Sequence, residues 1–433
     1  MCNGNLAWGG GEVWHLNAAR SLAARGLRVM LLCRAGSELH KRAGAEKGFE
    51  LYCLAPARLS FLNPLYMLRL FCFLRAHRPD ALILNLPSDL KAAAPMAKAV
   101  GVRQIIYRRG SDLPVRDSFL NRLLYGRIIN RLIVNSEATR RSALVNNPSL
   151  IPPERISVLP SGLDCAALDA ALTAAKNAQQ VAALDASKNA QQVAALSAEQ
   201  DAQQDATQDV KQVAERKIKR DLPSSLRHAP PRPFIIGNAG RLTRQKGQHL
   251  LLRLAARLCK ADFSFRLIIA GSGDLEGRLK ELARRLGVDD KVIFTGFLEN
   301  LAPFWTGIDI FISSSLWEGF GNVILEAGLA EKPVFAFNVS NLPELVAQGE
   351  NGLLFPLPAG AEKVGGGDSE WETDPGLYPE LDDLAVAVMK LAAYPDVAKG
   401  MGRKGRERAL GYGQELCMDR LMRLLAGPDL TAP

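Results

Sequence analysis

The chain has 433 residues, of which 48% are hydrophobic and 23% are charged, and this composition is that of ordinary globular proteins. A chain of this length is too long for one compact core, so we expect two or more domains. The net charge of +9 is concentrated in residues 1–165, which hold 23 Lys and Arg against 11 Asp and Glu. This balance favours an anionic partner, such as a membrane surface, a lipid-linked phosphate or an acidic glycan, with a solvated basic surface as the alternative.

Targeting and redox signals predict a cytoplasmic protein. No run of about 18 uncharged apolar residues occurs, so the sequence predicts no membrane-spanning helix. The N-terminus lacks a basic region followed by an apolar one, so no signal peptide is expected. The seven cysteines are scattered, odd in number and without a C-x-x-C pair, which favours reduced thiols.

The first half of the chain alternates predicted strands with predicted helices. A glycine triplet at residues 9–11 precedes a helix predicted over 12–24, and its backbone N–H groups could face an anion, although a flexible turn is the alternative. The helix predicted over 64–76 is apolar and accompanied by arginines. Such a helix can lie on a membrane, but we favour packing against a sheet.

Two arginines stand at a position where open α/β sheets bind ligands. Arg108 and Arg109 directly follow a strand predicted over 104–107, and the carboxyl ends of such strands line the binding crevice. We expect either arginine to bind a phosphate of an acceptor.

Residues 166–230 differ in composition from the rest of the chain. The segment 176–184 recurs unchanged as 188–196, and Ala and Gln dominate through residue 212. Its apolar residues are too small and sparse to bury a core, so we expect a surface insertion that is disordered or partly helical. A single protruding helix is the alternative, and the prolines between 223 and 233 indicate a linker.

The second half again alternates strands and helices. Strands are predicted over 234–239, 265–270, 291–294, 309–312 and 333–337, a hairpin-like turn over 349–355, and amphipathic helices over 381–391 and 414–425. The pattern in both halves predicts an α/β fold of two doubly wound domains facing a cleft. We expect domains at 1–165 and 231–410, the insertion at 166–230 between them, and a helix in 411–433 that crosses back to the first domain.

The stretch from Ser313 to Glu326 carries the most specific signal. A predicted strand precedes it, a helix follows it, and a glycine-bearing turn lies between two carboxylates, Glu318 and Glu326. A strand, a tight turn and a helix N-terminus make an anion site, and carboxylates accept hydrogen bonds from sugar hydroxyls. A diphosphate with sugar hydroxyls is the chemistry of a nucleotide sugar. A solvated loop followed by an ordinary helix is the alternative.

This stretch resembles the E-x7-E signature of the retaining, family-4-type nucleotide-sugar glycosyltransferases. The segment from Gly240 through Arg241 to Lys246 and Gly247 resembles the Gly-Arg-Leu…Lys-Gly element of the same family. The resemblance implies two Rossmann-like domains in the GT-B arrangement, and it covers nearly all of the chain outside the insertion.

The resemblance also implies a role for each matched residue. Glu318 would bind a donor-sugar hydroxyl near the anomeric carbon, Arg241 and Lys246 would neutralise the leaving diphosphate, and Glu326 would hold the ribose. The remaining expected donor-binding residues are glycines and their neighbours that offer backbone groups: Gly10, Gly11, Gly296, Gly319, Phe320, Gly321, Asn322 and Val323.

The sequence departs from the family pattern in two places. Many members carry a His where this chain has Arg108 and Arg109, so that role does not transfer. The family's first strand should precede the glycine triplet, but only Met1 and Cys2 stand there, so we expect a gap that exposes apolar sheet surface. No strict D-x-D motif occurs, so we expect no metal and no cofactor beyond the nucleotide-diphosphate sugar as co-substrate.

The expected function is retaining sugar transfer from a nucleotide sugar to a glycan or lipid-linked acceptor in lipopolysaccharide or surface polysaccharide assembly. Peripheral contact with an anionic membrane, at its inner face, suits the basic first half, and no nucleic-acid partner is expected. The alternatives are a nucleotide-sugar epimerase or a phosphorylase on a similar fold, or an inactive, degraded relative.

Overall fold

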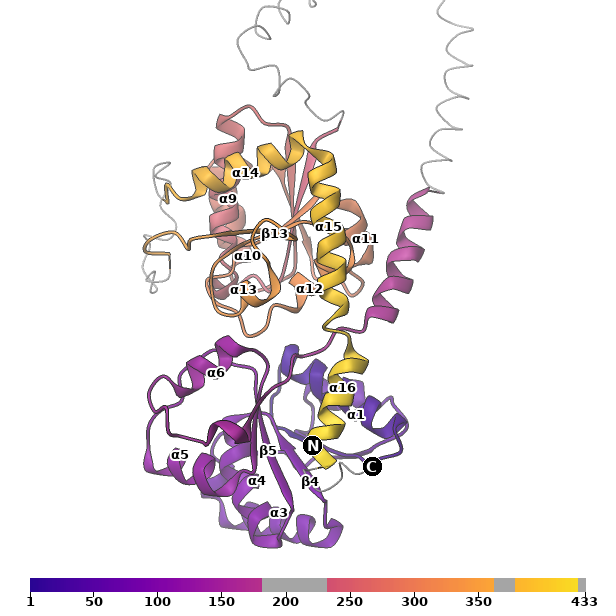
Figure 1. Ribbon diagram of the computed structural model, residues 1–433, viewed down its shortest axis with the longest axis vertical. Helices are drawn as coiled ribbons and strands as arrows, with labels where there is room; N and C mark the ends of the chain where they lie inside the picture. Colours follow the sequence, from indigo (N-terminus) through magenta and orange to yellow (C-terminus); the bar gives the residue numbers. More distant parts are fainter. Residues whose placement is uncertain (181–231, 362–377, 427–433) are drawn as a thin grey trace, which may run out of the picture.

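A computed structural model describes residues 1–180, 232–361 and 378–426. These residues form two α/β domains stacked along the long axis of the molecule (Figure 1). The expected α/β fold with two doubly wound, Rossmann-like domains is therefore confirmed. Most of the expected insertion lies outside the described residues.

The N-terminal domain is built on a seven-stranded parallel sheet in the order β3-β2-β1-β4-β5-β6-β7. Its strands are β1 (Cys2–Asn3), β2 (Met30–Cys33), β3 (Glu50–Tyr52), β4 (Ala81–Leu84), β5 (Gln104–Arg109), β6 (Arg131–Val134) and β7 (Ile156–Val158). Its helices are α1 (Gly10–Ala24), α2 (Glu38–Ala43), η1 (Ser60–Leu62), α3 (Pro64–His77), α4 (Pro87–Val100), α5 (Phe119–Leu123), η2 (Leu124–Ile128), α6 (Glu137–Leu144) and η3 (Pro153–Arg155).

The central position of this sheet is occupied by a very short strand. Cys2 pairs with Leu32 of β2 on one side and with Leu84 of β4 on the other, and its side chain is fully buried. The expected gap with exposed apolar sheet surface is therefore wrong. Two residues suffice because both neighbouring strands hold them, although they are too few to form a sequence pattern.

The core of the N-terminal domain lies on both faces of its sheet, because successive side chains of a strand point to opposite faces. In β4, Leu82 and Leu84 pack on the face that α3 and α4 cover, whereas Ile83 packs on the face that α1 covers. Strands that are buried on both faces consist of continuous apolar residues, so such strands can be predicted from the sequence.

The C-terminal domain is built on a six-stranded parallel sheet in the order β10-β9-β8-β11-β12-β13. Its strands are β8 (Phe234–Ala239), β9 (Phe265–Ala270), β10 (Val292–Gly296), β11 (Ile310–Ser313), β12 (Val334–Phe337) and β13 (Gly352–Phe355). Its helices are η5 (Arg244–Lys246), α9 (Gln248–Lys260), α10 (Glu276–Arg285), η6 (Asp289–Lys291), α11 (Ala302–Gly307), α12 (Asn322–Leu329), α13 (Leu342–Leu345), α14 (Leu381–Ala393) and α15 (Pro395–Leu410).

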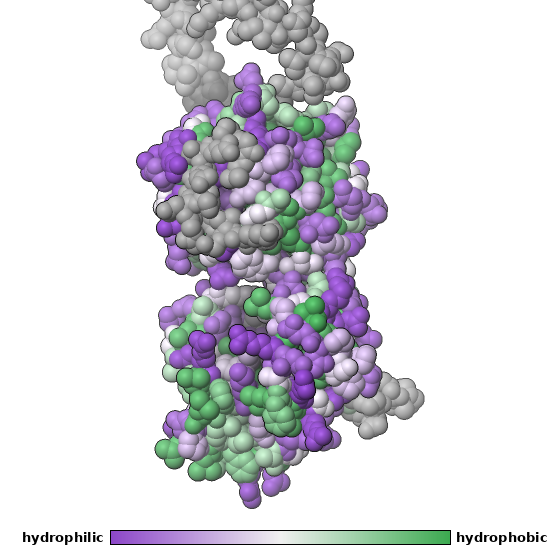
Figure 2. All heavy atoms as spheres, turned by 90° about the vertical axis from the view of Figure 1, so that its left-hand side faces the viewer, coloured by the Kyte–Doolittle hydropathy of each residue, from purple (hydrophilic) through white to green (hydrophobic). Residues whose placement is uncertain are grey.

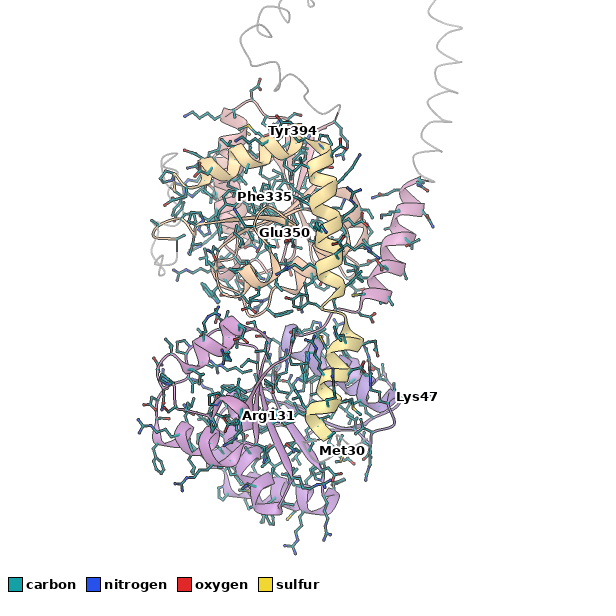
Figure 3. The ribbon with its side chains drawn as sticks, viewed as in Figure 1. Met30, Lys47, Arg131, Phe335, Glu350 and Tyr394 are labelled. Atoms are coloured by element: carbon teal, nitrogen blue, oxygen red, sulfur yellow. The ribbon has the colours of Figure 1, made fainter. Side chains whose placement is uncertain are left out.

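The same alternation organises this second core. In β12, Phe335 packs on the face covered by α9 and α14, inside the upper domain of Figure 3, and Ala336 packs on the face covered by α12. The segment Gly352–Phe355, predicted as part of a hairpin-like turn, is instead an edge strand parallel to β12. The sequence favours a turn here because Gly349 and Asn351 directly precede the strand and Gly352 begins it.

Two segments connect the domains. The last helix, α16 (Gln414–Ala426), packs on α1 and buries Cys417, Met418 and Leu421 in the core of the N-terminal domain (Figure 1). Residues 165–180 form a helix that buries Leu172 against the C-terminal domain, and Asp169 in this helix forms an ion pair with Arg406.

Candidate active site

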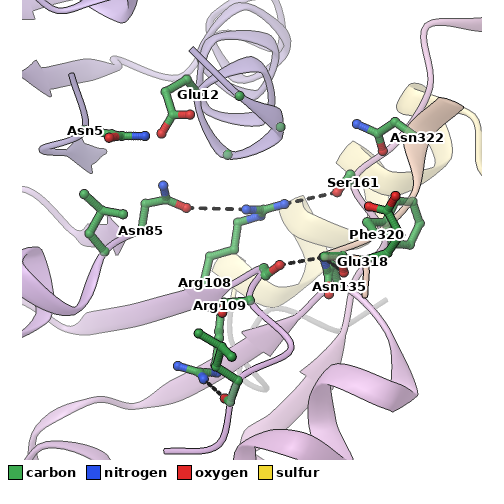
Figure 4. A pocket seen from close by; sticks show the side chains of 18 of the residues that line it. Asn5, Glu12, Asn85, Arg108, Arg109, Asn135, Ser161, Glu318, Phe320 and Asn322 are labelled. Atoms are coloured by element: carbon green, nitrogen blue, oxygen red, sulfur yellow. Dashed lines mark hydrogen bonds between the residues drawn. The ribbon is translucent and has the colours of Figure 1, made fainter. Parts of the chain in front are cut away.

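A cavity of about 740 Å³ lies between the carboxyl ends of the two sheets. Twelve of the fourteen residues proposed from the sequence line it: Gly10, Gly11, Arg108, Arg109, Arg241, Lys246, Glu318, Gly319, Phe320, Gly321, Asn322 and Val323. Gly296 and Glu326 are not among its lining residues. Both domains therefore contribute expected site residues to this cavity (Figure 4).

An ion pair marks the C-terminal side of the cavity. The Lys246 ammonium lies 2.5 Å from Oε1 of Glu318, and the same oxygen accepts a hydrogen bond of 2.6 Å from the Ser315 hydroxyl. The carboxylate is almost completely buried, so Lys246 and Ser315 hold it in one orientation. Its other oxygen, Oε2, makes no hydrogen bond to the described part of the chain and can accept one from a ligand hydroxyl.

Close backbone packing positions the lysine. Gly247 has a φ of +60°, and a Cβ at this residue would lie only 2.2 Å from the carbonyl oxygen of Ser314. The Ser314 hydroxyl also donates to the carbonyl of Lys246 at 2.8 Å. The Lys246 loop can therefore lie directly on the loop after β11, which brings the ammonium to Glu318.

The helix α12 begins at the cavity. Gly321 precedes it with a φ of +77°, and Asn322 is its first residue. Unpaired N–H groups and the helix dipole at this end favour an anion. Arg241, an exposed residue, lines the same cavity, so its guanidinium and the Lys246 ammonium can neutralise a diphosphate placed there.

The N-terminal domain presents its glycine triplet from the opposite wall. Gly11 lies so close to Asn85 that a Cβ would come within 2.9 Å of the amide nitrogen, and a Cβ at Gly10 would lie 3.8 Å from the Asn322 amide. Glu12, the next residue, is buried and accepts a hydrogen bond of 3.1 Å from Asn3. The start of α1 therefore faces the start of α12 across the cavity.

Arg108 and Arg109 point to different places. Arg108 extends between Asn85 and Ser161, to which it donates at 3.4 and 3.2 Å, whereas Arg109 turns away and donates to the carbonyl of Leu113 (Figure 4). The Arg108 guanidinium also lies 4.4 Å from the ring of Trp14.

Burial changes the titration of the groups around Arg108. Burial lowers the pKa of Arg108 to about 10, so the guanidinium remains charged at neutral pH. Burial, together with the charge of Arg108, lowers the pKa of His15 to about 3, so this imidazole is neutral. Within the described residues Arg108 has no ion-pair partner, and its Nε makes no hydrogen bond. Arg108 is thus a fixed positive charge on the N-terminal wall.

Two contacts join the walls directly. Asn135, at the end of β6, donates to the carbonyl of Gly319 at 2.9 Å. A Cβ at Gly319 would lie 2.7 Å from the carbonyl oxygen of Gly110, so only glycine permits this approach of the two domains. The glycine after Glu318 therefore allows the cleft to close.

Glu326 lies beside the aromatic wall of α11. It is on α12, one turn beyond the cavity, and burial raises its pKa to about 7 while the neighbouring Trp305 lowers it. Gly296 ends β10 with a φ of +72°, and its carbonyl accepts a hydrogen bond from the backbone of Gly271. Because neither residue lines the cavity, the ribose role of Glu326 and the role of Gly296 beside the base stay predictions.

The lining also includes polar residues that were not singled out from the sequence, among them Glu12, Asn85, Asn135, Ser161 and Gln245. Asn85 directly follows β4 and Asn135 directly follows β6, whereas Arg108 is one of the last two residues of β5. The rule that strand ends line the crevice could have selected both of them. Ser161 and Glu12 carry no comparable signal.

Two family models match the sequence. The model described as Glycosyltransferase Family 4 matches residues 8–167, and the model described as Glycosyl transferases group 1 matches residues 225–381. The chain belongs to the family-4 glycosyltransferases. The two matches cover both walls of the cavity, including the glycine triplet of the N-terminal domain and the E-x7-E stretch of this glycosyltransferase.

Curated relatives match parts of this glycosyltransferase. The putative glycosyltransferase EpsD of Bacillus subtilis is 28% identical over 188 residues, which span 43% of this chain and 44% of the relative. The lipopolysaccharide core biosynthesis glycosyltransferase LpsE of Rhizobium meliloti is 29% identical over 193 residues, 44% of this chain and 49% of that protein. The chain therefore spans about half the length of these relatives.

Solved structures match the fold over nearly the whole chain. A glycosyltransferase from Rickettsia africae aligns with a TM-score of 0.72 and 17% identity, covering 100% of this chain and 98% of the other. The Anabaena protein HepE, crystallised in complex with UDP and glucose, aligns with a TM-score of 0.67 and 19% identity, covering 98% of both chains. These likenesses confirm the GT-B arrangement of the family-4 glycosyltransferase.

Proposed function

We propose that the protein transfers a sugar from a nucleotide-diphosphate sugar to a glycan or lipid-linked acceptor, with retention of the anomeric configuration. The observation that supports this most is the convergence of Lys246, Arg241, Glu318 and the start of α12 on one wall of a cavity that both domains enclose. Positive charge, a helix N-terminus and a partly free carboxylate suit a diphosphate attached to a sugar.

The chemistry follows from these groups. As the bond between the anomeric carbon and the diphosphate oxygen breaks, negative charge grows on the leaving group, and Lys246, Arg241 and the N–H groups at the start of α12 stabilise it. Glu318 binds a sugar hydroxyl through Oε2 and orients the ring. The acceptor hydroxyl attacks the anomeric carbon from the face that the diphosphate leaves and gives its proton to an oxygen of the departing diphosphate, so the configuration is retained.

Arg108 supports an anionic acceptor. Its charge is fixed on the N-terminal wall in the same cavity as Lys246, and within the described residues it forms no ion pair, although the nearby Glu12 carboxylate partly offsets the lowering of its pKa by burial. An acceptor phosphate or carboxylate would pair with this guanidinium. Arg109 is less suited, because its guanidinium donates to the carbonyl of Leu113. A role in lipopolysaccharide or surface polysaccharide assembly at a membrane fits such an acceptor.

A donor screen tests this function. The purified protein is incubated with a panel of nucleotide sugars, with and without glycan acceptors, in the presence and absence of EDTA. We expect release of nucleoside diphosphate from at least one donor, faster with an acceptor and unchanged by EDTA, and a product whose anomeric configuration is that of the donor. Epimerised donor without transfer would indicate an epimerase, absorbance from a lysine-bound pyridoxal phosphate would indicate a phosphorylase, and no reaction would indicate an inactive relative.

A further inference from the structure

Four leucines of the N-terminal domain are unusually exposed. Leu59, Leu62, Leu65 and Leu68, here called the leucine stripe, have exposed fractions of 63%, 67%, 72% and 58%. They recur every third residue from just before η1 to the first turns of α3, and within α3 Leu65 and Leu68 share one side of the helix. Figure 2 shows apolar residues gathered on the surface of the lower, N-terminal domain.

The leucine stripe is separate from the side of α3 that packs in the core. The helix α3 already buries Leu70 and Leu74 against the sheet, with exposed fractions of 0% and 1%. It therefore carries apolar side chains on a buried side and on an exposed side. The sequence offered sheet packing and membrane contact as alternatives for this helix, and the structure leaves room for both. Adjacent exposed leucines of this kind mark an interaction surface.

The charge around the stripe has one sign. Residues 51–79 contain Arg58, Arg69, Arg75 and Arg78 and no Asp or Glu. All four arginines are exposed, and within the described residues none of them forms an ion pair. Other arginines of the same domain do have carboxylate partners, namely Arg20, Arg25, Arg28, Arg103, Arg122 and Arg140. The positive charge beside the stripe is thus left available to an anionic partner.

The stripe lies near the acceptor side of the cavity. The short helix η1 packs against α4, where the Lys91 ammonium lies 5.4 Å from the ring of Phe61. The first residue of α4, Pro87, lines the cavity, as does Leu86 before it. A surface that docks through the stripe would therefore lie close to the wall that carries Arg108.

We propose that the leucine stripe and its four arginines dock the N-terminal domain on an anionic lipid bilayer. The leucines enter the boundary between headgroups and acyl chains, and the arginines pair with lipid phosphates. The apolar and basic residues of an interfacial amphipathic helix contact a bilayer in the same two ways. This proposal rests on the proposed function in one respect: a bilayer beside the N-terminal wall would present a lipid-linked acceptor to the cavity.

Vesicle sedimentation tests the docking surface. We expect the protein to sediment with vesicles of phosphatidylglycerol and phosphatidylcholine, more weakly with phosphatidylcholine alone, and less as salt rises. The double variant Leu62→Ser/Leu65→Ser should bind the anionic vesicles at least about tenfold more weakly. Arg69→Glu should weaken binding about fivefold or more. As a matched control, Val386→Ser/Val397→Ser replaces exposed apolar residues of the C-terminal domain and should bind like the wild type.

Two results would overturn the proposal. One is absence of binding to anionic vesicles, or equal binding by the stripe variants and the wild type. The other is a concentration-dependent dimer, seen by light scattering, that the leucine variant abolishes, because the stripe would then belong to a second copy. Donor hydrolysis in solution separates this proposal from the proposed function: the stripe variants should hydrolyse donor normally, whereas Lys246→Ala should still bind vesicles while hydrolysing poorly.

Discussion

At the scale of single residues, Lys246 has a double role. Its ammonium holds Glu318 at 2.5 Å, yet it has three donors, so it can keep this carboxylate while it binds a phosphate oxygen. The Ser315 hydroxyl gives Glu318 a second fixed partner. The carboxylate that we propose orients the sugar and the ammonium that we propose stabilises the leaving charge are therefore held against each other.

Replacing this lysine should reduce turnover strongly. We expect Lys246→Ala to lose about 2–4 kcal/mol of transition-state stabilisation, because one charged donor to the leaving diphosphate is removed. Steady-state kcat/KM for the best donor is the measurement, with thermal unfolding to verify folding. Lys280→Ala is the matched control, since this lysine pairs with Glu276 on the outer face of α10. Equal turnover in all three proteins would refute the diphosphate role.

The raised pKa of Glu326 gives a prediction about pH. Burial holds the pKa of this carboxyl at about 7, above its ordinary value of 4.5, so the acid form predominates below pH 7. In the predicted ribose role, the hydroxyls of the donor would donate to the ionised carboxylate, so donor binding would have to release the proton at lower pH. The donor Kd should therefore rise about tenfold per pH unit well below pH 7. Glu326→Gln should bind the donor more weakly, with a Kd that does not change with pH. If the donor Kd changed with pH in the same way in the variant and the wild type, the ribose role would be excluded.

At the scale of elements, the N-terminus of α6 makes a defined contact between the domains. The carboxylate of Glu344, on α13, accepts from the backbone N–H groups of Glu137 and Ala138 at 3.0 and 2.7 Å. The backbone carbonyl of Glu344 is itself held by Arg408 and Tyr412. A negative charge from one domain thus caps a helix of the other, which favours the closed cleft.

Removing this carboxylate should favour an open cleft. Two charge-assisted hydrogen bonds are lost in Glu344→Ala, and at about 1.5–3 kcal/mol for such a bond we expect kcat/KM to fall at least about tenfold. Small-angle scattering should show a larger radius of gyration, with little change in the unfolding temperature. Glu350→Ala, at an exposed turn of the same domain, should behave as wild type. A Glu344→Ala protein with unchanged activity and scattering would show that the contact does not control closure.

Elements differ in how far the sequence could predict them. The buried strands were visible as apolar runs, but the 16-residue helix α15 was missed. It contains Gly402 and Gly405, which read as helix breakers in isolation. In the structure these glycines allow close helix packing, because a Cβ at Gly402 would lie 2.1 Å from the carbonyl oxygen of Glu331, and Gly405 abuts Gly328 of α12. Tertiary packing, which no local pattern records, explains this helix.

At the scale of the whole molecule, the site depends on how two domains meet. The E-x7-E stretch and the glycine triplet could be predicted separately, because each combines a strand or helix boundary with small residues. The contacts that join them could not, since Asn135 and Gly319 are 184 residues apart and carry no shared motif. The packing of α16 on α1 fixes the same arrangement.

The described part of the chain contains no helix that is both long and apolar enough to cross a bilayer. In our proposals, the basic N-terminal domain with its leucine stripe contacts the membrane and receives the acceptor through Arg108. The C-terminal domain receives the donor through Lys246 and Arg241.

The central claim is that the wall formed by Lys246, Arg241 and the start of α12 binds a nucleoside diphosphate. Calorimetric titration with the nucleoside diphosphate released by the best donor tests it most directly. We expect saturable binding by the wild type and by Lys280→Ala, and binding weakened at least about tenfold in Lys246→Ala, as loss of a charge-assisted contact requires. Equal affinity in all three proteins would contradict the account.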